Sequence, residues 1–186
     1  WHHAAIQENK QNSYDDLYAV AEDLIAQGIT SPGRIGVRGG SNGGLLVGVA
    51  FTQRPDLFKA AVCESPLLDM KRYTKMTIGE DFIREFGDPD DPEDWAYIQK
   101  YSPYHNLSPT KHYPEPLVAS ATTDDRAHPA HARKMVAKMK DMGHSAYYFE
   151  AFEGGHGPGA TLEREAHLEA LIYTYLGMKL MDVGVE

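Results

Sequence analysis

The order of apolar and polar positions along the chain predicts alternating helices and short strands. Helical patterns are predicted at 13–27, 43–53, 92–100, 129–142 and 160–176. Short apolar runs typical of buried strands are predicted at 34–37, 60–64, 116–122 and 145–152. Strands that alternate with helices in this way predict an α/β domain, with a parallel sheet covered by helices on both faces.

The first predicted helix shows the pattern most clearly. Ser13 is expected to cap it, with Asp16 three residues later. Gly28 suits the position just after its last turn. Its expected buried face consists of the apolar residues Leu17, Val20, Ala21, Leu24 and Ile25.

Composition and charge narrow the classes of function. The chain has 186 residues, of which 42% are hydrophobic, and a net charge of −9 from 27 acidic and 18 basic side chains. This balance, without a basic stripe, argues against nucleic acid as a partner. No apolar run approaches the ~18 residues of a membrane span, so we expect a soluble protein of the cytoplasm or periplasm. The single cysteine, Cys63, lies in an apolar run and is expected to be buried.

Three loops should meet at one edge of the predicted sheet, because each follows the carboxyl end of a strand. They are 39–43, 122–128 and 153–159. The first contains a G-x-S-x-G pattern centred on Ser41, between an apolar strand and an apolar helix. A serine on such a tight turn is displayed as a nucleophile, although a plain glycine-rich turn would have the same composition.

A nucleophilic serine needs a base and an acid. His156, flanked by glycines after the last strand, is the favoured base, and an exposed loop histidine is the alternative. Asp124 and Asp125 follow the third strand, and either of them could serve as the acid. The chain order serine, aspartate, histidine is that of α/β-hydrolases. The pair His128 and His131 makes a zinc site an alternative, but no third ligand lies at a familiar spacing. We therefore expect no metal or cofactor.

Several longer stretches resemble the catalytic domain of prolyl oligopeptidase family serine peptidases. They include the first 46 residues through "RGGSNGGLL", and also "QRPDLF", "KYSPYHNL", "DDRAHPAHARK" and "GGHGPG". The resemblance implies an α/β-hydrolase fold and cleavage of short peptides through an acyl-enzyme. It implies Ser41 as the nucleophile, His156 as the base and Asp124 as the acid.

The resemblance also implies roles in substrate binding. Arg126 would bind a backbone carbonyl of the peptide, and the backbone N–H of Asn42 would supply one oxyanion donor. Phe82 and Phe86 would stand where the family has a tryptophan and a tyrosine, and Leu67 would be a further wall of the pocket. The pocket is then aromatic and apolar, without an implied strict preference for proline. The alternative for the two phenylalanines is a helix packing face.

Residues 1–186 are expected to form the C-terminal part of such a catalytic domain. Only 33 residues precede the run "RIGV", whereas the family has several strands and a second oxyanion donor upstream. We therefore expect weak or absent activity for this chain alone, and self-association or pairing with the missing N-terminal part. An α/β-hydrolase esterase and a non-catalytic oligomerising fragment are the alternative functions.

Overall fold

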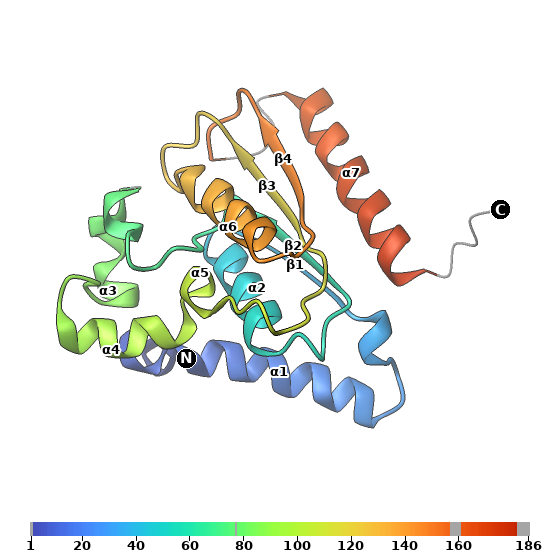
Figure 1. Ribbon diagram of the computed structural model, residues 1–186, viewed down its shortest axis with the longest axis horizontal. Helices are drawn as coiled ribbons and strands as arrows, with labels where there is room; N and C mark the ends of the chain where they lie inside the picture. The colour runs from blue at the N-terminus through green and yellow to red at the C-terminus, as the bar shows by residue number, and fades with distance from the viewer. Residues whose placement is uncertain (1, 77, 157–160, 182–186) are drawn as a thin grey trace.

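Four parallel strands form one sheet in the order β1-β2-β3-β4 in the computed structural model (Figure 1). The structure describes residues 2–76, 78–156 and 161–181. The strands are β1 (Gly36–Gly40), β2 (Ala60–Glu64), β3 (Leu117–Ala121) and β4 (Tyr147–Ala151). The predicted α/β class and parallel sheet are confirmed.

Helices occupy most of the rest of the described chain. The α-helices are α1 (Gln11–Ala26), α2 (Asn42–Gln53), α3 (Ile83–Phe86), α4 (Pro92–Tyr101), α5 (Pro103–Asn106), α6 (Ala130–Asp141) and α7 (Leu162–Leu180). Short 3-10 turns are η1 (His2–Ala5), η2 (Gln7–Asn9), η3 (Pro32–Arg34), η4 (Tyr73–Lys75) and η5 (Gly79–Phe82). No helix in these described ranges is both long enough and apolar enough to cross a membrane.

The core lies in two layers on either side of the sheet. Residues of α2 and α6, such as Val47 and Met135, pack with Cys63 on one face. On the opposite face, α7 presents Leu168 and Ile172 to the strands. A further apolar cluster joins α1 to the outer side of α2, so that α1 and α4 form the lower layer in Figure 1. Helices cover both faces, as predicted, and bury the two central strands β2 and β3, whereas the edge strands β1 and β4 stay partly exposed.

The start of α1 differs from the prediction. The helix begins at Gln11 with Lys10 as its N-cap residue, so Ser13 lies inside the helix and caps nothing. Its buried face is formed mainly by Tyr14 and Tyr18, together with the following residue of the same stripe, Ala21. Val20, expected in the core, is 58% exposed. The tyrosines lie one turn apart and bury their rings, which a search for aliphatic residues passes over.

Other boundaries shift by a few residues. The first strand runs over 36–40 instead of 34–37, so it includes the glycines before Ser41. The final helix continues four residues beyond the predicted end, to Leu180. Gly28 has a φ of 70° after α1, as expected of a helix-ending glycine. Helix ends are where local sequence signals are weakest.

Candidate active site

Ser41 lies on a sharp turn between β1 and α2. Its φ of 58° and ψ of −118° place it in a region that non-glycine residues rarely occupy. A side chain at Gly39 would bring its Cβ to 2.4 Å from the backbone oxygen of Gly43, so only glycine fits there. The turn therefore holds the serine side chain at the carboxyl edge of the sheet.

The segment after β2 packs tightly against this turn. The backbone N–H of Ser41 donates to the carbonyl oxygen of Glu64 at 2.8 Å. A Cβ at Gly44 would lie 2.8 Å from the Cβ of Pro66. By contrast, a Cβ at Gly43 would meet nothing within 4 Å. Steric need therefore explains Gly39 and Gly44, whereas a side chain at Gly43 would meet no steric obstacle.

Three side chains from three strand ends form a hydrogen-bonded chain. The Nε2 of His156 lies 3.0 Å from the Oγ of Ser41. The Nδ1 of the same ring lies 3.0 Å and 3.1 Å from the two carboxylate oxygens of Asp124. In the tautomer with hydrogen on Nδ1, the ring donates to Asp124 and accepts the serine proton at Nε2. This arrangement is suited to nucleophilic catalysis by serine.

Asp124 is held rigidly, and its side chain is fully buried. Its Oδ1 accepts backbone N–H groups of Arg126 at 3.0 Å and Ala127 at 2.9 Å. The neighbouring Asp125 is exposed. Of the two aspartates that the residue pattern left open, Asp124 is the one that contacts the imidazole. The backbone bonds and the histidine together satisfy a carboxylate that would otherwise be costly to bury.

Asn42 is the first residue of α2, so its N–H has no acceptor within the helix. The positive end of the helix dipole lies at the same place. Arg126 is exposed, and the described residues give its guanidinium no ion-pair partner. The nearby carboxylate of Glu153 accepts from Arg164 at 2.6 Å. Both groups are therefore free to contact a molecule bound above the sheet edge.

The predicted pocket residues have different surroundings. Phe82 is half-buried and lines a hollow together with Asn42. Phe86 is fully buried and packs edge-on against Tyr73, with ring centroids 5.5 Å apart. Leu67 is 2% exposed and belongs to the same apolar cluster. Phe82 is thus the one near the serine turn, and the others lie in the core behind it.

Arg38 joins the sheet to α7 beside the site. Its guanidinium donates to Glu64 through Nε at 2.7 Å and Nη2 at 3.1 Å. It also donates to Glu169 of α7 through Nη1 at 2.7 Å and through Nη2. The hydrogen bonds from Arg38 hold the pKa of Glu169 below its usual range. This bridge ties α7 to β1 and β2.

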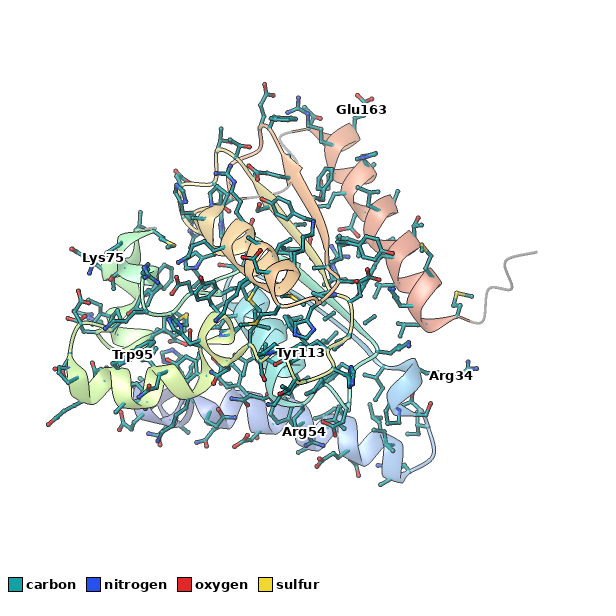
Figure 2. The ribbon with its side chains drawn as sticks, in the orientation of Figure 1. Arg34, Arg54, Lys75, Trp95, Tyr113 and Glu163 are labelled. Atoms are coloured by element: carbon teal, nitrogen blue, oxygen red, sulfur yellow. The ribbon has the colours of Figure 1, made fainter. Side chains whose placement is uncertain are left out.

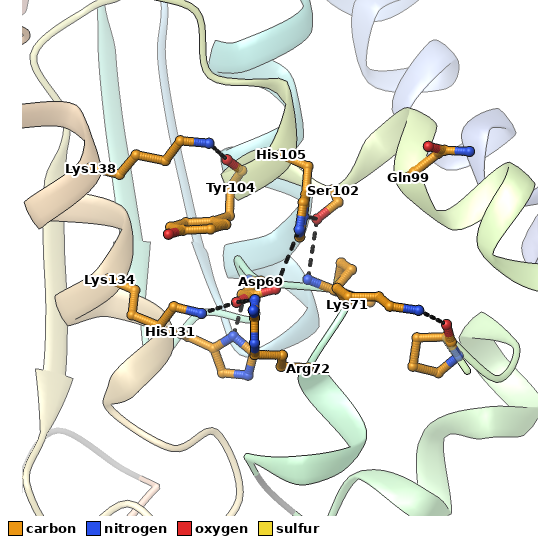
Figure 3. A network of polar contacts seen from close by, with 12 residues as sticks. Asp69, Lys71, Arg72, Gln99, Ser102, Tyr104, His105, His131, Lys134 and Lys138 are labelled. Carbon is orange, nitrogen blue, oxygen red and sulfur yellow. Dashed lines mark hydrogen bonds and ion pairs between the residues drawn. The ribbon is translucent and has the colours of Figure 1, made fainter. Parts of the chain in front are cut away.

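A second polar network lies on the other side of the sheet, around the buried carboxylate of Asp69 (Figure 3). Lys134 and Arg72 donate to Asp69, the latter at 3.1 Å. The backbone N–H of Asp69 donates to Nδ1 of His131 at 3.1 Å. Burial raises the pKa of Asp69, but Lys134 and Arg72 outweigh it and hold that pKa below its usual range. Burial lowers the pKa of His131 to about 4.

The two histidines of the zinc alternative point to different partners. His131 accepts from Asp69, and Nδ1 of His128 accepts from the backbone N–H of Ala130 at 3.1 Å. Within the described ranges, no three histidine, cysteine or acidic side chains are grouped as metal ligands would be. The network of Asp69 instead ties α6 to the segment that follows β2.

Sequence reasoning missed Glu64 and Ser65. Both line the same hollow of about 180 Å³ as Ser41 and His156. The signal was available, because Glu64 ends and Ser65 follows an apolar strand whose carboxyl end lies beside that of β1. A glutamate and a serine without a motif around them gave no reason to choose them.

The profile described as Prolyl oligopeptidase family matches residues 1–182. An uncharacterised peptidase of Sinorhizobium fredii is 50% identical over 182 residues, which are 98% of this chain and 25% of that protein. A prolyl endopeptidase of Dictyostelium discoideum is 36% identical over 189 residues, with 98% and 25% coverage.

Solved structures give the same result. A post-proline cleaving enzyme from Rickettsia typhi superimposes with a TM-score of 0.94 and 42% identity, over 97% of this chain and 26% of that one. Prolyl oligopeptidase B from Galerina marginata superimposes with a TM-score of 0.89 and 30% identity, over 97% and 26%. The chain therefore spans about a quarter of the length of the relatives that it matches.

Proposed function

Because the chain belongs to the prolyl oligopeptidase family, we propose that it carries the nucleophile, base and acid of a serine-type peptidase. The observation that carries this proposal is the hydrogen-bonded chain of Ser41, His156 and Asp124 at the carboxyl edge of a parallel sheet. The longer relatives named above include a prolyl endopeptidase and a prolyl oligopeptidase. Residues 1–186 would be the C-terminal part of the catalytic domain of such an enzyme.

In the acylation step, Ser41 Oγ attacks the carbonyl carbon of the scissile peptide bond as His156 Nε2 removes its proton. The negative charge that develops on the carbonyl oxygen is stabilised by the N–H of Asn42 and the N-terminus of α2. The imidazolium then gives its proton to the leaving amine. Asp124 keeps the ring oriented and stabilises its positive charge.

In the deacylation step, a water molecule attacks the ester that links the acyl group to Ser41. His156 Nε2 takes a proton from the water and returns one to Ser41 Oγ, which restores the free enzyme. A second oxyanion donor and further parts of the peptide site would come from outside this chain. Short peptides are the proposed substrates, held by Arg126 at a backbone carbonyl and by Phe82 at the acyl side of the bond.

The test is covalent labelling of the full-length protein, meaning the whole chain that its gene encodes. A fluorophosphonate should label Ser41 with a stoichiometry near one, and Ser41→Ala should abolish both labelling and hydrolysis of a prolyl-peptide anilide. Unchanged peptide hydrolysis by Ser41→Ala would rule out the role of Ser41. No cofactor is needed for these steps.

The same assay separates the peptidase from the esterase alternative, because an esterase shares the three residues. We compare the turnover of the peptide anilide with that of a short-chain p-nitrophenyl ester. We expect the ratio of these two rates to exceed the ratio of the uncatalysed hydrolysis rates of the two substrates. The reverse preference would favour the esterase. The free guanidinium of Arg126, which suits a peptide carbonyl, supports the peptidase.

A further inference from the structure

The backbone conformation of Ser65 is unfavourable for two reasons. Its φ is 40°, in the left-handed region where side chains are strained. The next residue is Pro66, and a residue before proline is normally confined to extended conformations. Neighbouring contacts hold this geometry. The N–H of Ser65 donates to the carbonyl oxygen of Ala119 at 2.8 Å, and Pro66 is wedged against Gly44.

The side chain of Ser65 is also unsatisfied. The residue is only 5% exposed, and its hydroxyl has no hydrogen-bond partner among the described residues. Buried hydroxyls without a partner are rare in native proteins, and strained residues gather at functional sites. Ser41 is another strained non-glycine residue of this chain, and both line one hollow.

The hollow lies on the base side of the nucleophile. It is lined by Gly40, Ser41, Glu64, Ser65 and His156 and holds about 180 Å³. A separate hollow contains Asn42 and Phe82, on the side of the proposed oxyanion and acyl group. Because water takes up about 30 Å³ per molecule, the first hollow has room for several.

Within the first hollow, the other polar side chains already have partners. Ser41 and His156 bond to each other, and both carboxylate oxygens of Glu64 accept from Arg38. The Oγ of Ser65 is covered at rest and has no partner among the described residues, so a rotation about χ1 that turns it toward the hollow breaks no hydrogen bond. It is therefore the lining side chain that is free to bond a molecule beside His156.

We propose that Ser65 binds and orients the water molecule that hydrolyses the acyl-enzyme, an inference that rests on the proposed peptidase function. The water donates one hydrogen bond to Ser65 Oγ and the other to His156 Nε2. Its oxygen forms a bond to the acyl carbon as the bond from that carbon to Ser41 Oγ breaks. The proton taken by His156 passes to Ser41 Oγ, so the products are a free carboxylic acid and the resting enzyme.

The experiment separates acylation from deacylation in the protein as its gene encodes it. A peptidyl p-nitrophenyl ester is used, because its leaving group departs without a proton and acylation appears as a burst. In Ser65→Ala, the steady-state deacylation rate should fall about tenfold, the effect of losing one hydrogen bond to the reacting water. The burst rate and the rate of fluorophosphonate labelling should stay within about twofold of the unsubstituted protein, since neither step uses that water.

Ser120→Ala is the matched control, because Ser120 is an equally buried serine whose hydroxyl has a partner in Tyr148, at 3.1 Å. It should leave the deacylation rate unchanged. Ser65→Gly serves if the alanine variant does not fold, because glycine adopts positive φ freely.

Two results would overturn the assignment and leave the peptidase function standing. One is an unchanged deacylation rate in both Ser65 variants. The other is an equal slowing of burst and deacylation, which would mean that Ser65 supports the whole site. A burst and labelling absent from the unsubstituted protein would instead overturn the proposed function, and this assignment with it.

Discussion

Ser41 and Ser65 are both non-glycine residues with positive φ, and each lies at the carboxyl end of a strand. Neither conformation follows from local preference, so the surrounding contacts must impose both. The N–H of Ser41 donates to the carbonyl of Glu64, the N–H of Ser65 donates to the carbonyl of Ala119, and Pro66 packs against Gly44. At the scale of single residues, the site is therefore held by backbone geometry as much as by its catalytic side chains.

Asp124→Asn tests whether the carboxylate acts through the imidazole. The amide retains the size of the side chain but cannot stabilise the imidazolium and favours the wrong tautomer. We expect kcat for a peptide anilide to fall by about 10³–10⁴-fold, with little change in Tm. The exposed neighbour Asp125 provides the control, and Asp125→Asn should leave kcat unchanged. A loss below tenfold for Asp124→Asn would contradict the assigned role.

Gly44→Ala tests the tight packing beneath Ser41. Its Cβ would lie 2.9 Å from the Cα of Pro66 and 3.0 Å from the carbonyl oxygen of Glu64, so the segment after β2 must move. We expect a loss of about 1–3 kcal/mol in the free energy of unfolding, together with reduced activity. Gly43→Ala, one residue earlier in open space, should be neutral or slightly stabilising. Equal unfolding midpoints in urea for the two variants would contradict this account.

At the scale of elements, Arg38 connects β1, β2 and α7. Arg38→Met should reduce kcat/KM about 3- to 10-fold, because Glu64, which lines the hollow of Ser41, then loses its tie to β1 and α7. The matched control is Arg54, whose guanidinium is also held by two carboxylates, those of Glu22 and Asp56. It lies beside α1, at the far end of α2 from Ser41 (Figure 2).

Arg54→Met should lower Tm about as much as Arg38→Met does and leave kcat/KM unchanged. Exposed ion pairs of this kind contribute about 0.2–1 kcal/mol each to stability. If both variants reduced kcat/KM equally, the loss would reflect stability alone, and the anchoring role of Arg38 would be wrong.

The network that ties α6 to the segment after β2 makes stability depend on pH. His131 stays neutral in the fold down to a pKa of about 4, whereas an unfolded histidine takes up a proton near pH 6.5. The unfolded state therefore binds more protons between these values, and stability falls as the pH is lowered through that window. Asp69, whose pKa is lowered in the fold, adds a further loss at lower pH, as it becomes protonated.

Urea unfolding at pH 7, 5.5 and 4.5 measures this dependence. His131→Asn, which retains an acceptor for the N–H of Asp69, should flatten the decline between pH 6.5 and 4. Replacing the exposed His112 by asparagine should leave the decline unchanged. An identical pH dependence for His131→Asn and the unsubstituted protein would show that His131 does not cause it.

The sequence pattern predicted the four strands and the longer helices because their apolar runs and glycines are strong local signals, but it did not predict the short helices α3 and α5. The strand that contains Cys63 was expected in its observed place, and so was the part of the loop up to His156, whereas residues 157–159 of the expected loop lie outside the described residues. The predicted start of α1 was wrong, since Lys10 occupies the N-cap position without a side-chain capping hydrogen bond and tyrosines build the buried face. Tertiary packing decided both points, and local propensity carries little information about it.

The candidate site likewise contains residues that the sequence indicates and residues that it does not. Ser41, His156 and the two aspartates could be named because each belongs to a glycine- or aspartate-rich loop after a strand. Glu64 and Ser65 could not, since their importance arises from which strands are neighbours and from a φ that Pro66 disfavours. Registration between strands is a property of the sheet and leaves no motif in the chain.

At the scale of the whole molecule, β1 is an edge strand of the sheet, as β4 is on the other side. Among the described residues it pairs with β2 alone, and Gly36, Arg38 and Gly40 on it are exposed. An unpaired strand edge favours association with another chain. We therefore expect residues 1–186, expressed alone, to form dimers or larger species and to be weakly active or inactive.

Sedimentation velocity over a range of concentrations measures the first expectation, and a compact monomer throughout would contradict it. Stoichiometric fluorophosphonate labelling of Ser41 in the isolated residues 1–186, at the rate of the protein as its gene encodes it, would contradict the second.

The burial of Cys63 makes the alkylation rate of its thiol a measure of how often this fold opens. It is the only cysteine of the chain, fully buried in β2 one residue before Glu64, and burial raises the pKa of its thiol. Only the thiolate reacts with alkylating reagents, so the folded molecule should be inert to them. Each alkylation then records one excursion in which the central strands have separated. The rate of iodoacetamide uptake thus reads the stability of the sheet beneath Ser41 without any added probe.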